Sequence, residues 1–339
     1  MNVVDDKPSA TGWITYFNHQ GRGGPMTRRS IAIATLLLMV ALTTSAAAPR
    51  QLMAAPPSPP AGAAPVLASR TQIYIGQGFD TCEIPSFDAL QEWITHSPYG
   101  AVNLYIGGSG RFCSNRALTA AFLTRLAGIG WKFIPTWVGP QAPCYTGNKP
   151  RMSADPAISN AEGAAEADAA VGVATGLGLA EADGSGTIIY YDMEHYDTGN
   201  TACNEAARSF ISGWTGRLRS RGNLVGVYGK GAALSGFVAS DNVPDAVWAA
   251  EWIRPFSYLP DITVWDIPNL SNTLWVNQQR MRQYAGGHAE TWGGVTLNID
   301  CNVIDGIVAS IPPPDLPFKA YLPAILNGVE NTISDASAP

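Results

Sequence analysis

Short apolar segments alternate with amphipathic helical patterns along most of this 339-residue chain, and this alternation constrains the fold more than any other feature. Eight apolar runs between Thr71 and Ser310 have the length of strands: Ile73–Asp80, Ala101–Ile106, Lys132–Val138, Thr187–Asp192, Leu224–Tyr228, Ala246–Glu251, Arg280–Tyr284 and Val295–Asp300. Several are nearly continuous in apolar side chains, as is typical of parallel strands that are covered on both faces.

Helical patterns occupy several of the intervals between these runs. Apolar residues recur at helical spacing in three of them: Phe87, Leu90 and Ile94, then Leu118, Phe122 and Leu126, then Ala207, Phe210, Ile211, Trp214 and Leu218. The second pattern ends at Gly128 and the third at Gly222, which are typical helix stops.

Eight strands with interspersed helices predict an α/β fold, specifically a TIM-type (β/α)8 barrel. The interval from Tyr284 to Val295 is too short for a full helix, so we expect the barrel to be irregular near its seventh and eighth strands. An open doubly wound sheet is the alternative. However, no G-x-G-x-x-G opens a helix after the first strand, and the sequence has no Walker loop. We therefore expect no nucleotide or other cofactor.

The charge balance excludes several classes of protein. Charged residues make up only 14% of the chain, which is too few for a coiled coil or an all-helical bundle. The net charge is −6, whereas a nucleic-acid binder needs a basic face for the phosphates. We expect a monomer that binds no nucleic acid.

The N-terminal part of the chain predicts export. Met26-Thr27-Arg28-Arg29, the apolar run Ile31–Leu42 and the small residues up to Ala48 follow the order of a secretory signal. The run is shorter than the ~20 residues that span a bilayer, which favours a signal peptide. An N-terminal membrane anchor is the alternative. Residues 1–25 are then an upstream extension, 26–48 a signal peptide of the general or twin-arginine type, and 49–70 an Ala- and Pro-rich linker. Residues 71–310 form the folded domain, and 311–339 a Pro-rich, apolar tail. The expected location is secreted or associated with the cell envelope.

Five cysteines fall in the exported part, where disulfides are favoured: Cys82, Cys113, Cys144, Cys203 and Cys301. The first four follow the first four predicted strands, so their loops should share one rim. Neighbouring loops favour the pairs Cys82–Cys113 and Cys144–Cys203, with Cys301 free. No CxxC pair exists and no histidine lies at metal-ligand spacing from a cysteine, so the sequence predicts no metal site.

Carboxylates stand at the ends of three predicted strands. Asp80 ends the first, Asp192 and Glu194 close the fourth, and Asp300 ends the eighth. Strand residues two apart point the same way, and barrel enzymes place their sites at the C-terminal mouth. We therefore expect all four carboxylates in one mouth, with Asp80 beside Asp300 through closure of the barrel. Like charges raise one another's pKa, which suits the paired carboxyl groups of glycoside hydrolysis. Metal binding and simple turn capping are the alternatives.

Aromatic residues at the ends of other predicted strands could stack on sugar rings: Tyr105, Trp137, Tyr228 and Trp252. A tryptophan or tyrosine at a single such position more often fills core space. No G-x-S-x-G indicates a serine nucleophile. Cys301 has no obvious histidine partner, while His288 lies in a glycine-rich segment that could border the mouth.

Several motifs occur in order along the chain: Gly78-Phe79-Asp80-Thr81-Cys82, Tyr105-Ile106-Gly107-Gly108, Gly139-Pro140-Gln141-Ala142-Pro143-Cys144, Tyr190-Tyr191-Asp192-Met193-Glu194, Gly226-Val227-Tyr228, and Gln283-Tyr284-Ala285-Gly286-Gly287-His288 through Asn298-Ile299-Asp300. In this combination the chain resembles the secreted bacterial glycoside-hydrolase-like domains, a family of unknown function that is similar in layout to the family 25 lysozymes. Those lysozymes cleave peptidoglycan. The resemblance covers Ile73 to Ser310.

This resemblance implies a TIM-like barrel with an acidic pocket. By analogy with the lysozymes, Glu194 takes the place of the general acid, Asp192 is its partner, and Asp80 and Asp300 complete the acidic ring. Gln141 and Gln283, which lie in the matching motifs, join the four aromatic residues as substrate-binding candidates. The implied function is hydrolysis of a cell-envelope glycan such as peptidoglycan. The alternative is a non-catalytic envelope protein that binds a glycan in the same pocket.

Overall fold

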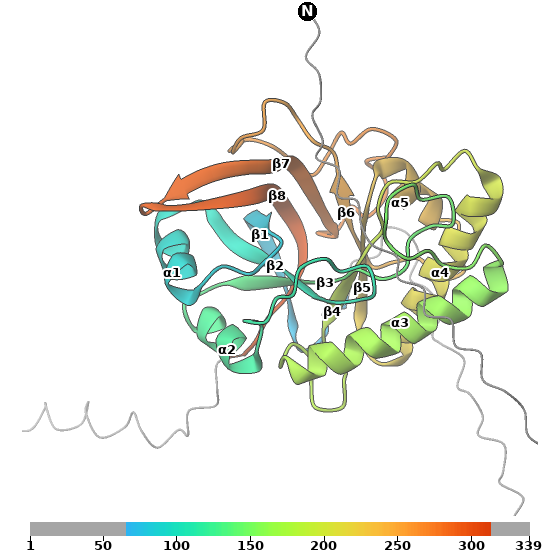
Figure 1. Ribbon diagram of the computed structural model, residues 1–339, viewed down its shortest axis with the longest axis horizontal. Helices are drawn as coiled ribbons and strands as arrows, with labels where there is room; N and C mark the ends of the chain where they lie inside the picture. The colour runs from blue at the N-terminus through green and yellow to red at the C-terminus, as the bar shows by residue number, and fades with distance from the viewer. Residues whose placement is uncertain (1–65, 313–339) are drawn as a thin grey trace, which may run out of the picture. The chain divides into compact units, whose positions relative to one another are not determined.

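Eight strands form one closed ring, in sequence order, in the computed structural model, which describes residues 66–312 (Figure 1). The strands are β1 (Thr71–Asp80), β2 (Tyr99–Gly107), β3 (Lys132–Trp137), β4 (Ile188–Asp192), β5 (Leu224–Gly229), β6 (Ala246–Ala250), β7 (Arg280–Trp292) and β8 (Val295–Ala309). The predicted α/β class is therefore confirmed, and each of the eight predicted runs lies wholly or mostly within a strand. The predicted leader (1–48), most of the linker (49–70) and nearly all of the tail (311–339) lie outside the described residues.

The direction of the last strand departs from the predicted (β/α)8 barrel, in which all eight strands are parallel. Strands β1 to β7 pair in parallel, but β8 runs antiparallel to both of its ring neighbours, β7 and β1. The reason lies at the β7–β8 connection, where Gly293 and Gly294 adopt φ angles of +57° and +78°. Two positive φ angles in a two-residue loop make a tight hairpin turn, which reverses the chain with no crossover helix. The expected irregularity near the last two strands is thus a long hairpin.

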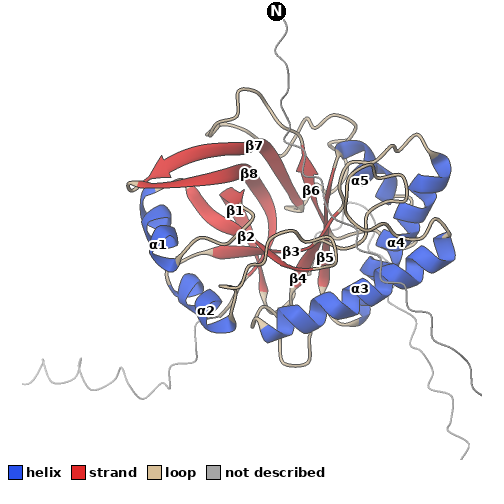
Figure 2. Ribbon diagram, in the orientation of Figure 1, coloured by secondary structure: helices blue, strands red, loops and turns tan. Residues whose placement is uncertain are grey.

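Five α-helices follow the first five strands, and residues 66–312 contain no further α-helix: α1 (Phe87–His96), α2 (Ala120–Gly128), α3 (Pro156–Gly176), α4 (Thr201–Ser220) and α5 (Gly231–Phe237). They lie outside the ring, with α1 and α2 on one side and α3 to α5 on the other (Figure 2). Polar side chains cap the helix starts, as when the Ser86 hydroxyl accepts the Ala89 N–H and the Asn200 side chain accepts the Cys203 N–H. No described helix is both long and apolar enough to cross a bilayer.

Two glycines let α3 and α4 pack in close contact. A Cβ atom at Gly163 on α3 would overlap the carbonyl oxygen of Phe210, and one at Gly213 on α4 would overlap that of Asn160. Each helix therefore presents bare backbone to the other.

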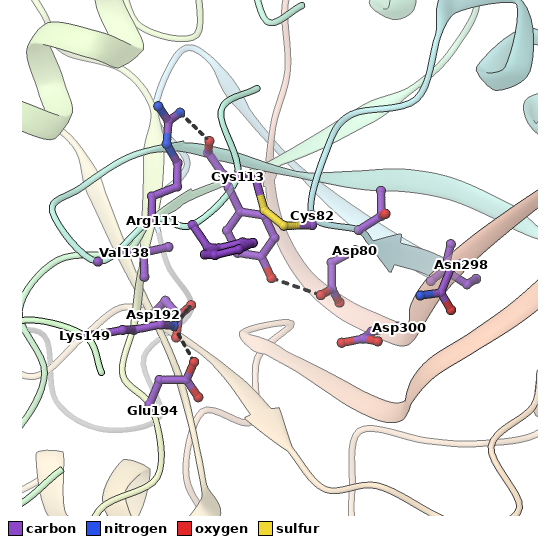
Figure 3. A pocket seen from close by; sticks show the side chains of 15 residues that line it. Asp80, Cys82, Arg111, Cys113, Val138, Lys149, Asp192, Glu194, Asn298 and Asp300 are labelled. Atoms are coloured by element: carbon purple, nitrogen blue, oxygen red, sulfur yellow. Dashed lines mark hydrogen bonds and ion pairs between the residues drawn. A yellow bond between two sulfur atoms is a disulfide. The ribbon is translucent and has the colours of Figure 1, made fainter. Parts of the chain in front are cut away.

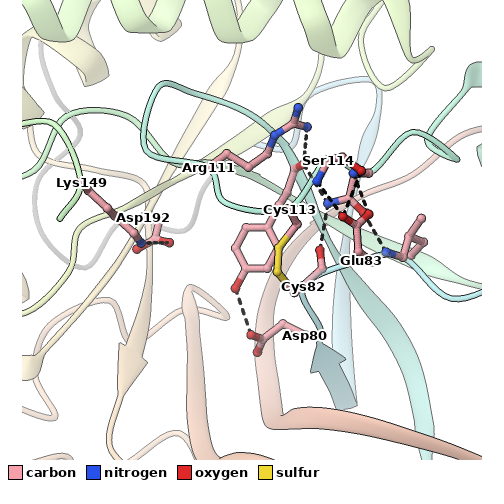
Figure 4. Close-up of a disulfide and its surroundings, with 11 residues drawn as sticks. Asp80, Cys82, Glu83, Arg111, Cys113, Ser114, Lys149 and Asp192 are labelled. Atoms are coloured by element: carbon pink, nitrogen blue, oxygen red, sulfur yellow. Dashed lines mark hydrogen bonds and ion pairs between the residues drawn. A yellow bond between two sulfur atoms is a disulfide. The ribbon is translucent and has the colours of Figure 1, made fainter. Parts of the chain in front are cut away.

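Both predicted disulfides are present. Cys82 pairs with Cys113, and Cys144 pairs with Cys203, while Cys301 is free and buried. The first bridge joins the loops that follow β1 and β2 (Figure 4). Beside it, the Glu83 carboxylate accepts the backbone N–H groups of Ser114 and Asn115, both at 2.7 Å. These contacts hold the loop after β2 over the open end of the ring.

Candidate active site

The four predicted carboxylates line one cavity of about 460 Å³ at the carboxyl ends of the parallel strands (Figure 3). Asp80 and Asp300 lie on one wall, whereas Asp192 and Glu194 lie on the other. The remaining lining residues come mainly from loops: Thr81, Cys82, Tyr105, Gly110, Arg111, Phe112, Cys113, Val138, Lys149, Asn298 and Ile299. A cavity of this size is typical of sites for small ligands.

Asp80 and Asp300 are brought together by an antiparallel register. They are directly opposed partners in the β1–β8 ladder. We expected Asp300 at the end of a parallel strand, but it lies within the longer, reversed β8. Their juxtaposition is therefore as predicted, whereas the topology that produces it is different.

Donors surround this aspartate pair. The Gln283 Nε2 donates to both Asp80 oxygens, at 3.1 and 3.0 Å, and to Asp300 at 3.3 Å. The Asn302 amide and the Tyr105 hydroxyl also donate to Asp80, at 2.8 and 3.1 Å. Asp80 is nevertheless buried, and burial together with the charge of Asp300 raises its pKa to about 8 against the opposing effect of these donors. Near neutral pH this wall therefore holds a proton.

The Asp192–Glu194 segment is held by a buried glutamine. The Gln141 Nε2 donates to the carbonyl oxygens of Gly139 and Asp192, and its Oε1 accepts the Glu194 N–H at 2.8 Å. Burial and the charge of Glu194 raise the pKa of Asp192 to about 7, while Lys149 lowers it. Within the described part of the chain the Asp192 Oδ1 atom has no hydrogen-bond partner, which favours the protonated carboxyl group.

Lys149 is a site residue that the sequence analysis missed. Its Nζ atom lies 2.5 Å from the Glu194 Oε1 and 3.8 Å from the Asp192 Oδ2. It comes from the loop between β3 and α3, where the sequence carries no strand or helix pattern that would point it toward the carboxylates. An ammonium group therefore contacts the more exposed member of the carboxylate pair.

The six predicted substrate-binding residues fall into two groups. Tyr105 lines the cavity, and Trp252 is exposed. Tyr228 and Trp252 both donate to the Gln283 Oε1, at 2.9 and 2.8 Å, so they orient the amide that serves Asp80. Five of the six are not among the residues that line the cavity: Trp137, Gln141, Tyr228, Trp252 and Gln283.

Trp137 and Gln141 are buried, and they act on neighbouring groups rather than on the open cavity. The Trp137 indole donates to Glu166 on α3 at 2.5 Å, and its ring covers Gly107. Trp137 is therefore part of the packing between the ring and α3. Gln141 and Gln283 are the amides that position the two carboxylate walls.

Phe112 and Asn302 were also missed by sequence reasoning. Phe112 lines the cavity with 95% of its side chain exposed, on the loop fixed by the Cys82–Cys113 bridge. No pattern in that loop predicts it. Asn302 was accessible to sequence reasoning, because it lies two residues after Asp300 on the same strand and so shares its face.

A carboxylate-lined pocket on a closed α/β sheet is the arrangement of a glycoside-hydrolase-like domain. Residues 91–304, more than half of the chain, match the family model described as "Rv2525c-like, glycoside hydrolase-like domain". The chain belongs to this family, as its motifs indicated. Among curated proteins no match was found.

Three of the solved structures that match this chain share little sequence with it. The spore cortex lytic enzyme SleM of Clostridium perfringens is 17% identical, with a TM-score of 0.43, over 68% of this chain and 67% of that one. The glycosyl hydrolase 25 GHIP of Streptococcus pneumoniae is 13% identical, with a TM-score of 0.39, over 67% and 86% of the two chains. The catalytic domain of the endolysin ply40 from Listeria phage P40 is 14% identical, with a TM-score of 0.39, over 68% and 93%.

Proposed function

We propose that this protein is a secreted glycoside hydrolase that cleaves a cell-envelope glycan of the peptidoglycan type by carboxylate acid/base catalysis. In this proposal the ring is a TIM-type barrel whose last strand is reversed. The observation that carries the proposal is the placement of four carboxyl groups on two walls of one cavity, three of them with a raised pKa. Membership of the glycoside-hydrolase-like family supports it. Two disulfides suit an exported protein.

Glu194 is the proposed proton donor to the glycosidic oxygen. Its side chain is 35% exposed in the cavity, whereas Asp192 beneath it is 8% exposed. Asp192 lies beside it with a pKa of about 7, so below that pH Asp192 holds a proton that can pass to Glu194. When substrate is bound, the glycosidic oxygen takes the place of the Lys149 ammonium as the partner of Glu194.

The opposite wall then acts on the anomeric carbon. As the bond from that carbon to the protonated oxygen breaks, positive charge develops on the sugar ring. The Asp80–Asp300 pair, with one negative charge and one proton, faces this position from across the cavity. Water supplies the hydroxyl group of the new reducing end, and its remaining proton returns to a carboxylate.

Release of reducing ends from purified peptidoglycan and other envelope glycans tests the proposal. We expect Glu194→Gln and Asp192→Asn to abolish turnover while each variant still folds and binds glycan. Glu251→Gln is the matched control, because Glu251 is a partly exposed carboxylate that pairs with Lys230 outside this cavity. If the wild type cleaves none of the panel but binds one glycan tightly, hydrolysis is refuted and the protein is a glycan-binding envelope protein.

A further inference from the structure

The β7–β8 hairpin gathers three possible metal ligands outside the acidic cavity. His288 and Glu290 lie two residues apart on β7, and Cys301 lies on β8. Cys301 is adjacent to Asp300 on its strand, so its side chain points to the opposite face of the sheet. The ligand atoms of these three residues all lie within 4.8 Å of one another. Below, they are called the hairpin cluster.

Distances within the hairpin cluster match those of a tetrahedral zinc site. Zn–S, Zn–N and Zn–O bonds of about 2.3, 2.05 and 2.1 Å at tetrahedral angles put sulfur about 3.6 Å from nitrogen and about 3.6 Å from oxygen. The Cys301 Sγ lies 3.6 Å from the His288 Nε2 and 3.4 Å from the Glu290 Oε1. The remaining edge, from the His288 Nε2 to the Glu290 Oε1, is 2.8 Å. This edge must widen by about 0.6 Å to reach the spacing of two zinc ligands, whereas the two edges from Cys301 lie within about 0.2 Å of their tetrahedral values.

Further side chains support the carboxylate and supply a fourth ligand. The Trp292 indole donates to the Glu290 Oε2 at 2.8 Å, and the Glu290 Oε1 is the oxygen that faces His288 and Cys301. The Tyr99 hydroxyl, at the start of β2, lies 2.9 Å from the Cys301 Sγ and 3.0 Å from each Glu290 oxygen. Its oxygen, or a water in its place, completes four-coordination.

The hairpin cluster is buried and lacks a strong cation. Cys301 is fully buried, and the His288 and Glu290 side chains are only 14% and 10% exposed. Within residues 66–312 the recorded ion pair of Glu290 is with His288, and the buried His288 Nδ1 has no hydrogen-bond partner. A carboxylate in such surroundings is costly unless it is paired or coordinates a metal. The partly exposed His288 leaves a route for an ion from solvent.

We propose that His288, Glu290 and Cys301 bind one Zn²⁺ ion, which fastens the β7–β8 hairpin to the start of β2. One thiolate, one imidazole and one carboxylate are a zinc-type ligand set, whereas Mg²⁺ and Ca²⁺ prefer oxygen ligands alone. Binding releases the Cys301 thiol proton to solvent. The neutral His288 ring keeps its proton on Nδ1 and gives Nε2 to the metal.

No motif in the sequence predicted this site, because the ligands are brought together by strand pairing. Cys301 pairs with Ala285 and His288 pairs with Ile299, with irregular register between Ala285 and His288. The prediction of no metal site considered spacing along the chain. In an antiparallel hairpin, residues 11 and 13 positions apart become neighbours across the ladder.

Cobalt binding by the disulfide-intact, full folded protein tests the proposal directly. The four other cysteines are bridged, so a thiolate-to-cobalt charge-transfer band reports Cys301 alone. We expect this band, displaced by one equivalent of Zn²⁺, in the wild type. Cys301→Ser should abolish the band, and His288→Ala should weaken Zn²⁺ binding by on the order of 100-fold or more, beyond the loss typical of an outer-shell residue.

His195→Ala is the matched control, since it removes an exposed imidazole elsewhere and should bind Zn²⁺ as the wild type does. Circular dichroism establishes that each variant is folded, and Glu290→Gln provides a third ligand variant should Cys301→Ser not fold. The proposal is overturned if the folded wild type binds neither Co²⁺ nor Zn²⁺ at micromolar concentrations. It is equally overturned if the ligand variants bind Zn²⁺ as tightly as the His195→Ala control, which would indicate adventitious surface binding.

Discussion

Replacing Lys149 with methionine isolates the electrostatic control of the proposed proton donor. The substitution keeps most of the length of the side chain and removes its charge. In the wild type, burial and Glu194 raise the pKa of Asp192 to about 7, and Lys149 opposes them. Without the ammonium group, that opposing effect disappears, and the pKa of Asp192 rises further.

The size of the effect follows from the 3.8 Å between the Lys149 Nζ and the Asp192 Oδ2. Two unit charges about 4 Å apart interact by about 4 kcal/mol at an effective dielectric constant near 20. The Lys149 side chain is 24% exposed, and solvent screens part of this interaction. We assume that about one third of the interaction energy remains after screening. This remainder, about 1.4 kcal/mol, corresponds to about one pKa unit.

The direction of the pH change is fixed by the role of the proton. Catalysis that needs a protonated carboxyl group persists below its pKa and is lost as the pH rises through it. In the wild type we therefore expect the alkaline limb of kcat/KM near pH 7, where the pKa of Asp192 lies. In Lys149→Met the limb should move up by about one pH unit.

Rates of reducing-end release from pH 4 to 10 measure this limb. Lys230→Met serves as the control, because Lys230 lies 3.8 Å from Glu251, outside the carboxylate cavity, and should leave the limb in place. A limb that stays at the wild-type pH in Lys149→Met, or moves down, would refute the assignment of the proton to the Asp192–Glu194 pair.

Three further predictions concern binding, packing and export. Phe112→Ala should leave the unfolding free energy unchanged and raise KM about fivefold, if its exposed ring contributes the ~1 kcal/mol of an aromatic contact; an unchanged KM contradicts this. Gly163→Ala should destabilise the protein by about 1–3 kcal/mol in urea unfolding, because the methyl group overlaps the Phe210 carbonyl. Gly172→Ala, with open space on the same helix, should not destabilise it. N-terminal sequencing of the secreted protein should find a start between Ala47 and Ala64, and an extracellular product beginning at Met1 would exclude the signal.

The first six strands were predictable from the sequence, because near-continuous apolar runs of this length are typical of strands that are buried on both faces. The seventh and eighth were predicted too short. Gly286-Gly287 looked like a loop, yet Gly287 takes a φ of +51° within β7, where the register of the ladder shifts. A local pattern could not distinguish this bulged strand from a loop, nor show that Gly293-Gly294 would reverse the chain.

The positions of the carboxylates were predictable for a simple reason: strand ends and two-residue alternation determine which mouth and which face a side chain reaches. No such rule predicts where a side chain on an irregular loop points, which is why Lys149 and Phe112 were missed. Trp137, a predicted substrate-binding residue, does not line the cavity for a different reason. It ends a strand as expected, but the missing side chain at Gly107 gives its ring a surface to cover, and its indole turns to Glu166 on α3.

Cleavage of peptidoglycan in heavy-oxygen water, followed by mass spectrometry of the products, tests the central claim most directly. Hydrolysis by the carboxylate pocket predicts one heavy oxygen at each new reducing end for the wild type, and no new ends for Glu194→Gln at equal glycan binding. Absence of labelled ends across the panel of envelope glycans, or products formed without incorporation of the label, would contradict the account.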